Sequence, residues 1–262
     1  MRAGLFSQIT SPPLSRRIMT EGILQAQATN TILQAIQKRP PAVHCLTNTV
    51  VQALTANMLL AVGAHPSMSS DIIEIADFVR NADALLINLG TLDDARKEAI
   101  GTALQVANAT DIPWILDPVL VDRAPARLAY AHHLIKKGPS VIRGNAGEIS
   151  ALADDPACLA RAAGAIVAVT GAIDLVTDGK SEITCEGGHA LMSRVTGIGC
   201  AGTALIAAFC AIVTEDERLD AVMQALEFLG TAGEEAAKLS PAPGGFAAAI
   251  LDQIYLSSQS ST

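Results

Sequence analysis

The 262-residue chain predicts an α/β fold with a mostly parallel central sheet, helices on both faces and an antiparallel hairpin late in the sheet. First, short and almost wholly apolar segments alternate with helical patterns, which is typical of parallel strands covered on both faces. Second, residues 173–194 alternate around an Asp178-Gly179 pair, which favours a tight hairpin. Third, 50% of the residues are hydrophobic but only 3% are aromatic, so aliphatic side chains must build the core.

The expected elements follow in chain order. Apolar residues recurring every four positions predict a helix from Thr49 that ends at Gly63, a common type of C-cap. After a strand at 84–90, a helix is expected over 91–108, with Thr91 as its N-cap. The further expected elements are strands at 114–118, 140–143 and 165–171, helices at 125–136 and 156–163, and helices from residue 200 almost to the end.

No repeat or low-complexity linker divides the chain, so we expect one domain over residues 21–256. Residues 1–20 are expected to form a flexible N-terminal tail, and the Ser-rich residues 257–262 a disordered one. The longest apolar run, 201–213, is shorter than the ~20 residues that a membrane span needs. This run therefore indicates a buried helix, and no membrane partner is expected.

Charge and cysteine usage narrow the functional classes. The net charge is -8 and no run of Lys or Arg exceeds two residues, which argues against nucleic acid as a partner. The five cysteines form no CxxC pair, and the histidines show no HxxxH or HExxH spacing. A disulfide framework and a zinc site are both disfavoured, and a reducing cytoplasm is the expected location.

The most informative segment is VTGIGCAGTALIAAF at 195–209. Gly197 and Gly199 allow a sharp turn before a nearly all-apolar helix, whose first N–H groups can hold a phosphoryl group as charge spreads over it. Cys200 lies at the helix start, where a thiol pKa tends to be lowered. An ordinary packing turn with a buried cysteine explains the same residues equally well.

Two other sequence motifs suggest different nucleotide-binding sites. Gly197, Gly199 and Gly202 match the dinucleotide pattern GxGxxG, but no strand with an acidic residue follows the helix, so NAD is disfavoured. The Gly-Lys-Ser triplet at 179–181 mimics the end of a P-loop, but it lies in the expected hairpin and lacks the first glycine. We interpret it as a chance match.

Polar residues follow several expected strands at their carboxyl ends, where open parallel sheets bind ligands. Asp117 ends one strand, and Asn145 and Glu148 follow another. Asp117 and Glu148 are candidate Mg²⁺ ligands, directly or through water. Asn145 and Glu148 also have the spacing of a helix capping box, and Asp117 could simply close a turn. Thr170, at the end of 165–171, is a candidate contact for a nucleotide phosphate or a turn residue.

Seven segments occur in a fixed order and together are more specific than any one of them. They are HCLTN (44–48), ANMLLAVGAHPSM (56–68), LLINLGTL (85–92), ILDPV (115–119), IRGNAGEI (142–149), AVTG (168–171) and VTGIGC (195–200). With these segments the chain resembles the hydroxyethylthiazole kinases over residues 41–211, with weaker similarity to the end. The resemblance implies a ribokinase-like fold, usually trimeric, with sites at subunit boundaries. It also implies Mg²⁺-dependent transfer of the ATP γ-phosphoryl group to the primary alcohol of 4-methyl-5-(2-hydroxyethyl)thiazole, in thiamine biosynthesis or salvage.

The resemblance also implies roles for single residues. Cys200 stands where most ribokinase-like enzymes have aspartate, and cysteine there is typical of the thiazole kinases. It would be the catalytic residue, although a thiol is a poorer proton acceptor than a carboxylate, so positioning and charge stabilisation must contribute more. The remaining implied roles are substrate binding for Met68, Asn48 and Gly197, and ATP phosphate binding for Arg127 and Thr170.

Two departures from the family leave alternatives open. The family is glycine-rich after Val119, whereas this chain has Leu120, Asp122 and Arg123, and the segment 149–164 is shorter than usual. A catalytically weak thiazole- or nucleotide-binding protein is therefore one alternative, which ligands would stabilise without product formation. Another is a related kinase for a different small alcohol, such as a pyrimidine alcohol or a sugar.

Overall fold

The computed structural model describes residues 15–18 and 22–259, and in this part of the chain nine strands form one sheet. Their order across the sheet is β1-β9-β8-β7-β6-β5-β4-β2-β3. The strands are β1 (Ser15–Ile18), β2 (Ala42–Leu46), β3 (His65–Ser67), β4 (Ala84–Asn88), β5 (Trp114–Asp117), β6 (Val141–Asn145), β7 (Ile166–Thr170), β8 (Ile173–Thr177) and β9 (Ser181–Glu186).

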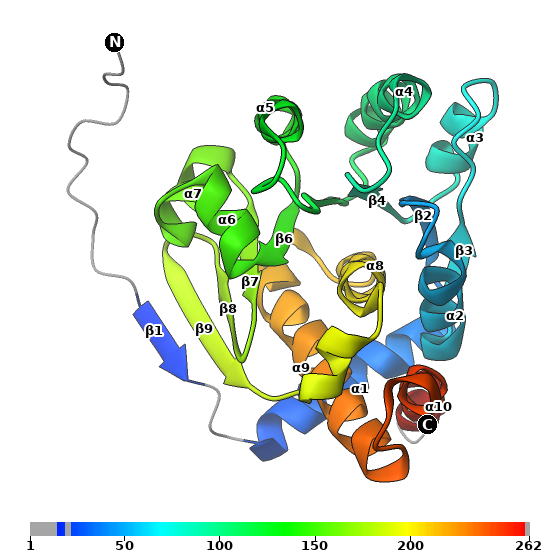
Figure 1. Cartoon of the computed structure of the whole chain (residues 1–262), viewed down its shortest axis with the longest axis vertical. Coiled ribbons are helices and arrows are strands. Elements are labelled where there is room, and N and C mark those ends of the chain that lie inside the picture. The colour runs from blue at the N-terminus through cyan, green and yellow to red at the C-terminus, as the bar shows by residue number, and fades with distance from the viewer. Residues whose placement is uncertain (1–14, 19–21, 260–262) are drawn as a thin grey trace.

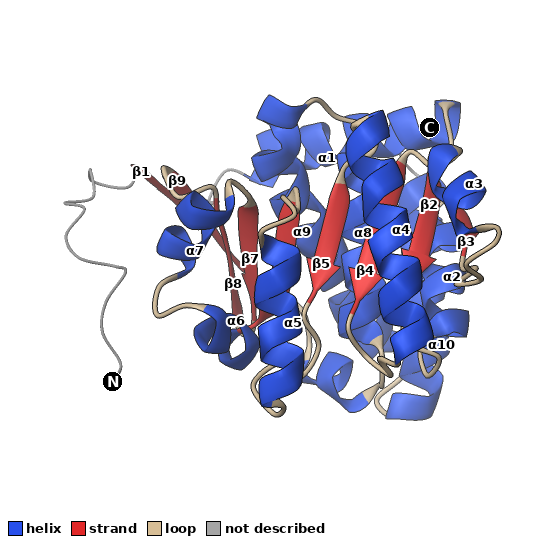
Figure 2. Cartoon of the chain, turned by 90° about the horizontal axis from the view of Figure 1, so that it is seen from above, coloured by secondary structure: helices blue, strands red, loops and turns tan. Residues whose placement is uncertain are grey.

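Helices cover both faces of this sheet (Figures 1 and 2). One face carries α3 (Ile75–Arg80), α4 (Asp94–Thr110), α5 (Pro125–Ile135), α6 (Ala146–Leu152) and α7 (Pro156–Ala163). The other carries α1 (Gly22–Lys38), α2 (Gln52–Val62), α8 (Ile198–Cys210), α9 (Arg218–Leu239) and α10 (Pro243–Gln259), with 3-10 turns at η1 (Ala190–Arg194) and η2 (Glu215–Glu217). The predicted α/β class is confirmed.

The pairing of the strands confirms the predicted parallel sheet with a late hairpin. From β3 through β7 every pairing is parallel, whereas β7–β8 and β8–β9 are antiparallel. Gly179 has φ 84°, and Asp178 Oδ1 accepts a hydrogen bond from the Ser181 amide at 2.6 Å, so the predicted turn closes the hairpin. Lys180 lies in this turn, which agrees with the interpretation of Gly-Lys-Ser as a chance match.

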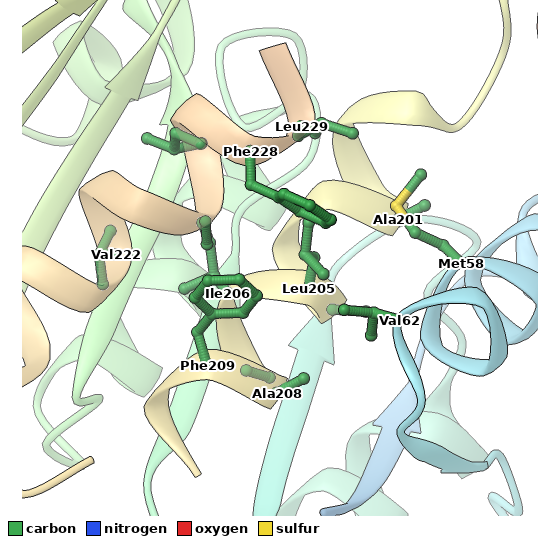
Figure 3. Packing of buried hydrophobic residues seen from close by; sticks show 14 of the residues in the cluster. Met58, Val62, Ala201, Leu205, Ile206, Ala208, Phe209, Val222, Phe228 and Leu229 are labelled. Carbon is green, nitrogen blue, oxygen red and sulfur yellow. The ribbon is translucent and has the colours of Figure 1, made fainter. Parts of the chain in front are cut away.

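Buried hydrophobic residues form one cluster on each side of the sheet. On the α8 side, residues of α2, α8 and α9 gather in a single group (Figure 3). Phe209 of α8 is fully buried, and its ring centroid lies 6.1 Å from that of Phe228 of α9. Helix α8 is therefore a buried central helix, as its apolar sequence predicts, and within residues 22–259 no helix is both long and apolar enough to cross a membrane.

Some predicted boundaries differ from the structure. Thr91 does not cap α4: it has φ 45°, and the Asp93 side chain accepts the capping hydrogen bond from the Arg96 amide at 2.8 Å. In the regions expected to be tails, β1 pairs with β9 and α10 continues to Gln259. Residues 1–14, 19–21 and 260–262 of those expected tails lie outside the described residues.

Candidate active site

The glycine turn before α8 is held in place by close packing. Gly197 has φ 92°, and a Cβ atom on it would lie 2.5 Å from Cγ1 of Val51 at the start of α2. Its carbonyl accepts the first helical hydrogen bond, from the Ala201 amide at 2.8 Å. A Cβ on Gly202 would lie 2.6 Å from Leu229 of α9. Backbone conformation and packing therefore require glycine at residue 197, whereas Gly202 leaves room for the end of the Leu229 side chain.

The order of the elements after α8 argues against the dinucleotide-binding alternative. After α8 the described chain continues through η2, α9 and α10, and its last strand is β9 before the turn. No strand follows that could carry an acidic residue to a ribose within residues 198–259, so the GxGxxG match does not have the surroundings that NAD binding requires.

Four polar residues meet at the carboxyl ends of β2, β4 and β5. Asn88 at the end of β4 is central: its Nδ2 donates to Asp117 Oδ2 at 2.6 Å, and its Oδ1 accepts from Asn48 Nδ2 at 3.1 Å. Asn48 Nδ2 also lies 3.8 Å from the sulfur of Cys200. The structure thus brings together three of the predicted site residues, Asn48, Asp117 and Cys200, through a residue that the sequence analysis did not select.

Two groups of this cluster have strongly shifted pKa values. Burial raises the pKa of Asp117 to about 6, against the opposing influence of the Arg143 charge. Burial and the negative charge of Asp117 raise the pKa of Cys200 to about 12. The expectation of a lowered thiol pKa is therefore wrong. The helix start does favour a thiolate, but desolvation and a neighbouring carboxylate both oppose it, and they dominate.

Glu148 has a structural role that the sequence left open. Its Oε2 accepts from the Asn145 amide and the Asn145 side chain accepts from the Glu148 amide, both at 2.9 Å, so the capping box is present. Its other oxygen accepts from the Leu120 amide at 2.9 Å. Leu120 has φ 58°, a backbone conformation that glycine adopts more easily. The loop after Val119, which lacks the glycines of the family, therefore keeps a glycine-like backbone conformation at this residue.

The two predicted metal ligands meet a basic requirement of a Mg²⁺ site. The negative charge of Glu148 raises the pKa of Asp117, so the two carboxylates are close enough to repel each other. No group of three or more His, Cys, Asp or Glu residues within residues 22–259 forms a complete metal cage. Two carboxylates suffice for Mg²⁺ that keeps water ligands and binds substrate phosphates, so these residues fit that ion.

A cavity of about 580 Å³ lies beside this cluster. Its lining includes Thr170 at the end of β7 and the following Gly171, Arg143 of β6 and Gly199 of α8. The Thr170 hydroxyl donates to the Gly144 carbonyl at 3.4 Å. Thr170 therefore faces a space next to the start of α8, where a nucleotide contact is expected.

The remaining predicted residues lie outside the polar cluster. Met68 directly follows β3 and packs against the core. The buried His44 ring bridges Ser67 and Ser69, the two residues that flank Met68. Its Nε2 donates to the Ser69 carbonyl at 2.9 Å, and its Nδ1 accepts from the Ser67 hydroxyl at 2.7 Å. Arg127 in α5 donates to the Val119 carbonyl at 2.8 Å, and no hydrogen bond within residues 22–259 joins it to the cluster.

Sequence reasoning missed Asn88, Thr203, Arg143 and Arg96. Thr203, one turn after Gly199, donates to Asp117 Oδ2 at 3.3 Å. Arg96 is buried and donates to the carbonyls of Leu46 and Asn88, so it links the ends of β2 and β4. Asn88 and Arg143 carried a usable signal, because each is a polar residue near the end of a mostly apolar strand.

Comparisons with known proteins show the family of the chain. The chain matches the Hydroxyethylthiazole kinase family over residues 33–161 and 155–259. It is 46% identical over 242 residues to the hydroxyethylthiazole kinase of Serratia proteamaculans, covering 85% of this chain and 91% of that protein. The identity to the protein of the same name in Cronobacter sakazakii is 41% over 256 residues, covering 90% of this chain and 96% of that one.

Solved structures extend the comparison to the fold. The hydroxyethylthiazole kinase protein of Pyrococcus horikoshii superposes with a TM-score of 0.84 at 37% identity, covering 88% of this chain and 93% of that chain. A ribokinase-like superfamily protein of Enterococcus faecalis superposes with a TM-score of 0.63 over 98% of this chain and 99% of that chain, and at 14% identity it shows the fold alone. The fold is ribokinase-like, and the chain belongs to the hydroxyethylthiazole kinase family.

Proposed function

We propose that this chain is a kinase that transfers the γ-phosphoryl group of ATP to the primary alcohol of 4-methyl-5-(2-hydroxyethyl)thiazole, in thiamine biosynthesis or salvage. Family membership supports the substrate and the reaction. The observation that carries the proposal is the meeting of Asn48, Asp117 and Cys200 where α8 begins. Unpaired N–H groups of the first helical turn can stabilise negative charge on a transferring phosphoryl group there.

The chemical role of Cys200 follows from its raised pKa. At neutral pH a thiol with a pKa of about 12 is protonated, so it cannot remove a proton efficiently. Cys200 therefore orients the alcohol through hydrogen bonding, and the loose transition state of phosphoryl transfer needs little prior removal of the hydroxyl proton. Asn48 holds the sulfur in place, and Gly197 offers its backbone to the substrate.

The nucleotide and the thiazole would occupy opposite sides of this point. Thr170 and Arg127 would contact the ATP phosphates, and Met68 would lie against the thiazole ring. Asp117 and Glu148 would hold Mg²⁺, in part through water, because the backbone amides of Leu120 and Asn145 already bind Glu148. When bound, the ion would neutralise charge on the phosphates.

We further propose a homotrimer with the sites at subunit boundaries, in the cytoplasm. Exposed apolar side chains support such a boundary, since Ile73, which follows Met68 in the chain, is 87% exposed and Val50, which follows Asn48, is 68% exposed. All five cysteines are free, which suits a reducing compartment. Sedimentation equilibrium would test the oligomer, and a monomeric mass at micromolar concentration would contradict it.

A coupled ADP-release assay with the thiazole alcohol, ATP and Mg²⁺ tests the proposed reaction. The wild type, Cys200→Ala and Cys200→Asp variants are compared, with the alcohol omitted as a control. We expect the alanine variant to lose most turnover and the aspartate variant to retain it. Equal rates in all three proteins would remove Cys200 from the mechanism. Ligand-induced thermal stabilisation without ADP release would instead indicate a binding protein.

A further inference from the structure

Arg143 of β6 approaches the start of α8 closely. Its guanidinium lies against Gly199, since a Cβ atom on this glycine would lie 2.9 Å from Arg143 Nη1 and 3.4 Å from Nη2. The approach is open because residue 199 has no side chain. Arg143 thus places a positive charge beside Gly199, the residue before Cys200. This charge lies on the wall of the 580 Å³ cavity that Thr170 also lines.

This charge has no ion-pair partner in the described structure. Among residues 22–259, no carboxylate oxygen is found within 4.0 Å of the Arg143 nitrogen atoms, and its buried Nε has no hydrogen-bond partner. A guanidinium has five donors, and leaving a buried donor without a partner destabilises the folded protein. Burial raises the pKa values of Asp117 and Asp174, and the nearby Arg143 charge opposes that rise, but neither carboxylate neutralises the guanidinium through contact.

An anionic ligand would satisfy these donors. The planar guanidinium fork matches two oxygens of a phosphoryl group, and a lysine at the same place could offer only a point charge. The cavity extends from the expected nucleotide contact, Thr170, to Gly199, the residue that precedes Cys200. A phosphoryl group moving from one to the other would pass beside Arg143.

We propose that Arg143 is a catalytic residue that binds the equatorial oxygens of the phosphoryl group during its transfer. In this step the bond from the γ-phosphorus to the β–γ bridging oxygen breaks, and its electron pair leaves with ADP. The alcohol oxygen forms the new bond to phosphorus, and the hydroxyl proton passes to a phosphoryl oxygen and then to solvent. The role rests on the proposed kinase function and adds a residue to it.

Kinetics of Arg143→Met and Arg143→Lys test this role, with Arg80→Met as the matched control because Arg80 is an exposed arginine of α3. For Arg143→Met we expect kcat to fall about 100-fold or more, as for loss of one transition-state donor, with the KM for the alcohol changed less than about twofold. Arg143→Lys should have a kcat about tenfold higher than that of Arg143→Met, because lysine restores the positive charge but not the planar pair of donors of the guanidinium. The control should match the wild type.

Nucleotide binding separates this inference from the proposed function. By calorimetry, Arg143→Met should weaken binding of a non-hydrolysable ATP analogue more than tenfold and leave ADP binding unchanged, whether or not the wild type phosphorylates the thiazole alcohol. Equal losses for both nucleotides, a kcat within about threefold of wild type, or a lowered melting temperature with no recovery by lysine would overturn the catalytic role. An inactive wild type that still shows the analogue difference would contradict the thiazole reaction alone.

Discussion

Replacing Asp117 with asparagine should stabilise the folded chain at neutral pH. Asp117 is 1% exposed, and its pKa rises from 3.8 to about 6 on burial. Once the pH is well above both values, ionisation of this carboxyl costs the folded state about 3 kcal/mol. Asparagine avoids that cost, and its side-chain oxygen can still accept the hydrogen bonds from Asn88 and Thr203.

The sign of the pH dependence follows from the raised pKa. Well below pH 3.8 the carboxyl is protonated in both states and the folded chain bears no penalty. The penalty grows as the pH rises from 3.8 to about 6, and above about 6 it is fully present and constant. The stability gain of Asp117→Asn should therefore be about 1.4 kcal/mol larger near pH 8 than near pH 5.

Urea unfolding of the wild type and Asp117→Asn at these two pH values, in the presence of EDTA, measures the difference. EDTA removes divalent cations, which would favour the ionised carboxyl and hide the effect. A variant that is less stable than the wild type near pH 8, or a gain that does not change with pH, would refute the reasoning that burial dominates at Asp117. The same variant should lose kinase activity, because asparagine is a weaker metal ligand.

Three other substitutions test separate parts of the structure. Gly197→Ala should lose about 2 kcal/mol or more of unfolding free energy and most turnover, because φ 92° is strained for alanine and its Cβ would overlap Val51; unchanged urea midpoints would contradict this. Phe209→Ala should cost about 3–5 kcal/mol in urea unfolding while the kcat of the folded fraction is retained, and a loss below about 1 kcal/mol would show that the core collapses around the gap. His44→Ala should raise the KM for the alcohol about tenfold with little change in kcat, since both bonds that position the Met68 segment are lost. An equal rise in the KM for ATP in steady-state assays would show a general distortion instead.

Local signals predicted most of the fold. Asp178 and Gly179 predicted the hairpin because the turn depends on two adjacent residues, and Gly63 predicted the end of α2 for the same reason. Thr91 was chosen wrongly as a cap, because Asp93 is also a good N-cap and only the backbone conformation at the turn decides between them.

The candidate site was predictable as a set of positions but not as a network. Strand ends indicated Asp117, but Asn88 reaches both Asn48 and Asp117 only because β4 lies between β2 and β5, an order that the sequence does not state. The thiol pKa of Cys200 depends on the same order, since the strand end of β5 places a carboxylate beside it. Residues that are distant in sequence therefore determine the hydrogen bonds and the thiol pKa of the site, whereas local motifs indicated only its positions.

The contact between Asn48 and Cys200 joins residues separated by 152 positions. Neither half of the polypeptide contains both, so fragments that retain native secondary structure would still lack the reaction centre. During refolding, the Cys200 sulfur would stay accessible to alkylating reagents until the late helix docks on the early strands. Its labelling rate would therefore time the last stage of assembly, and recovery of enzymatic turnover should follow the same time course.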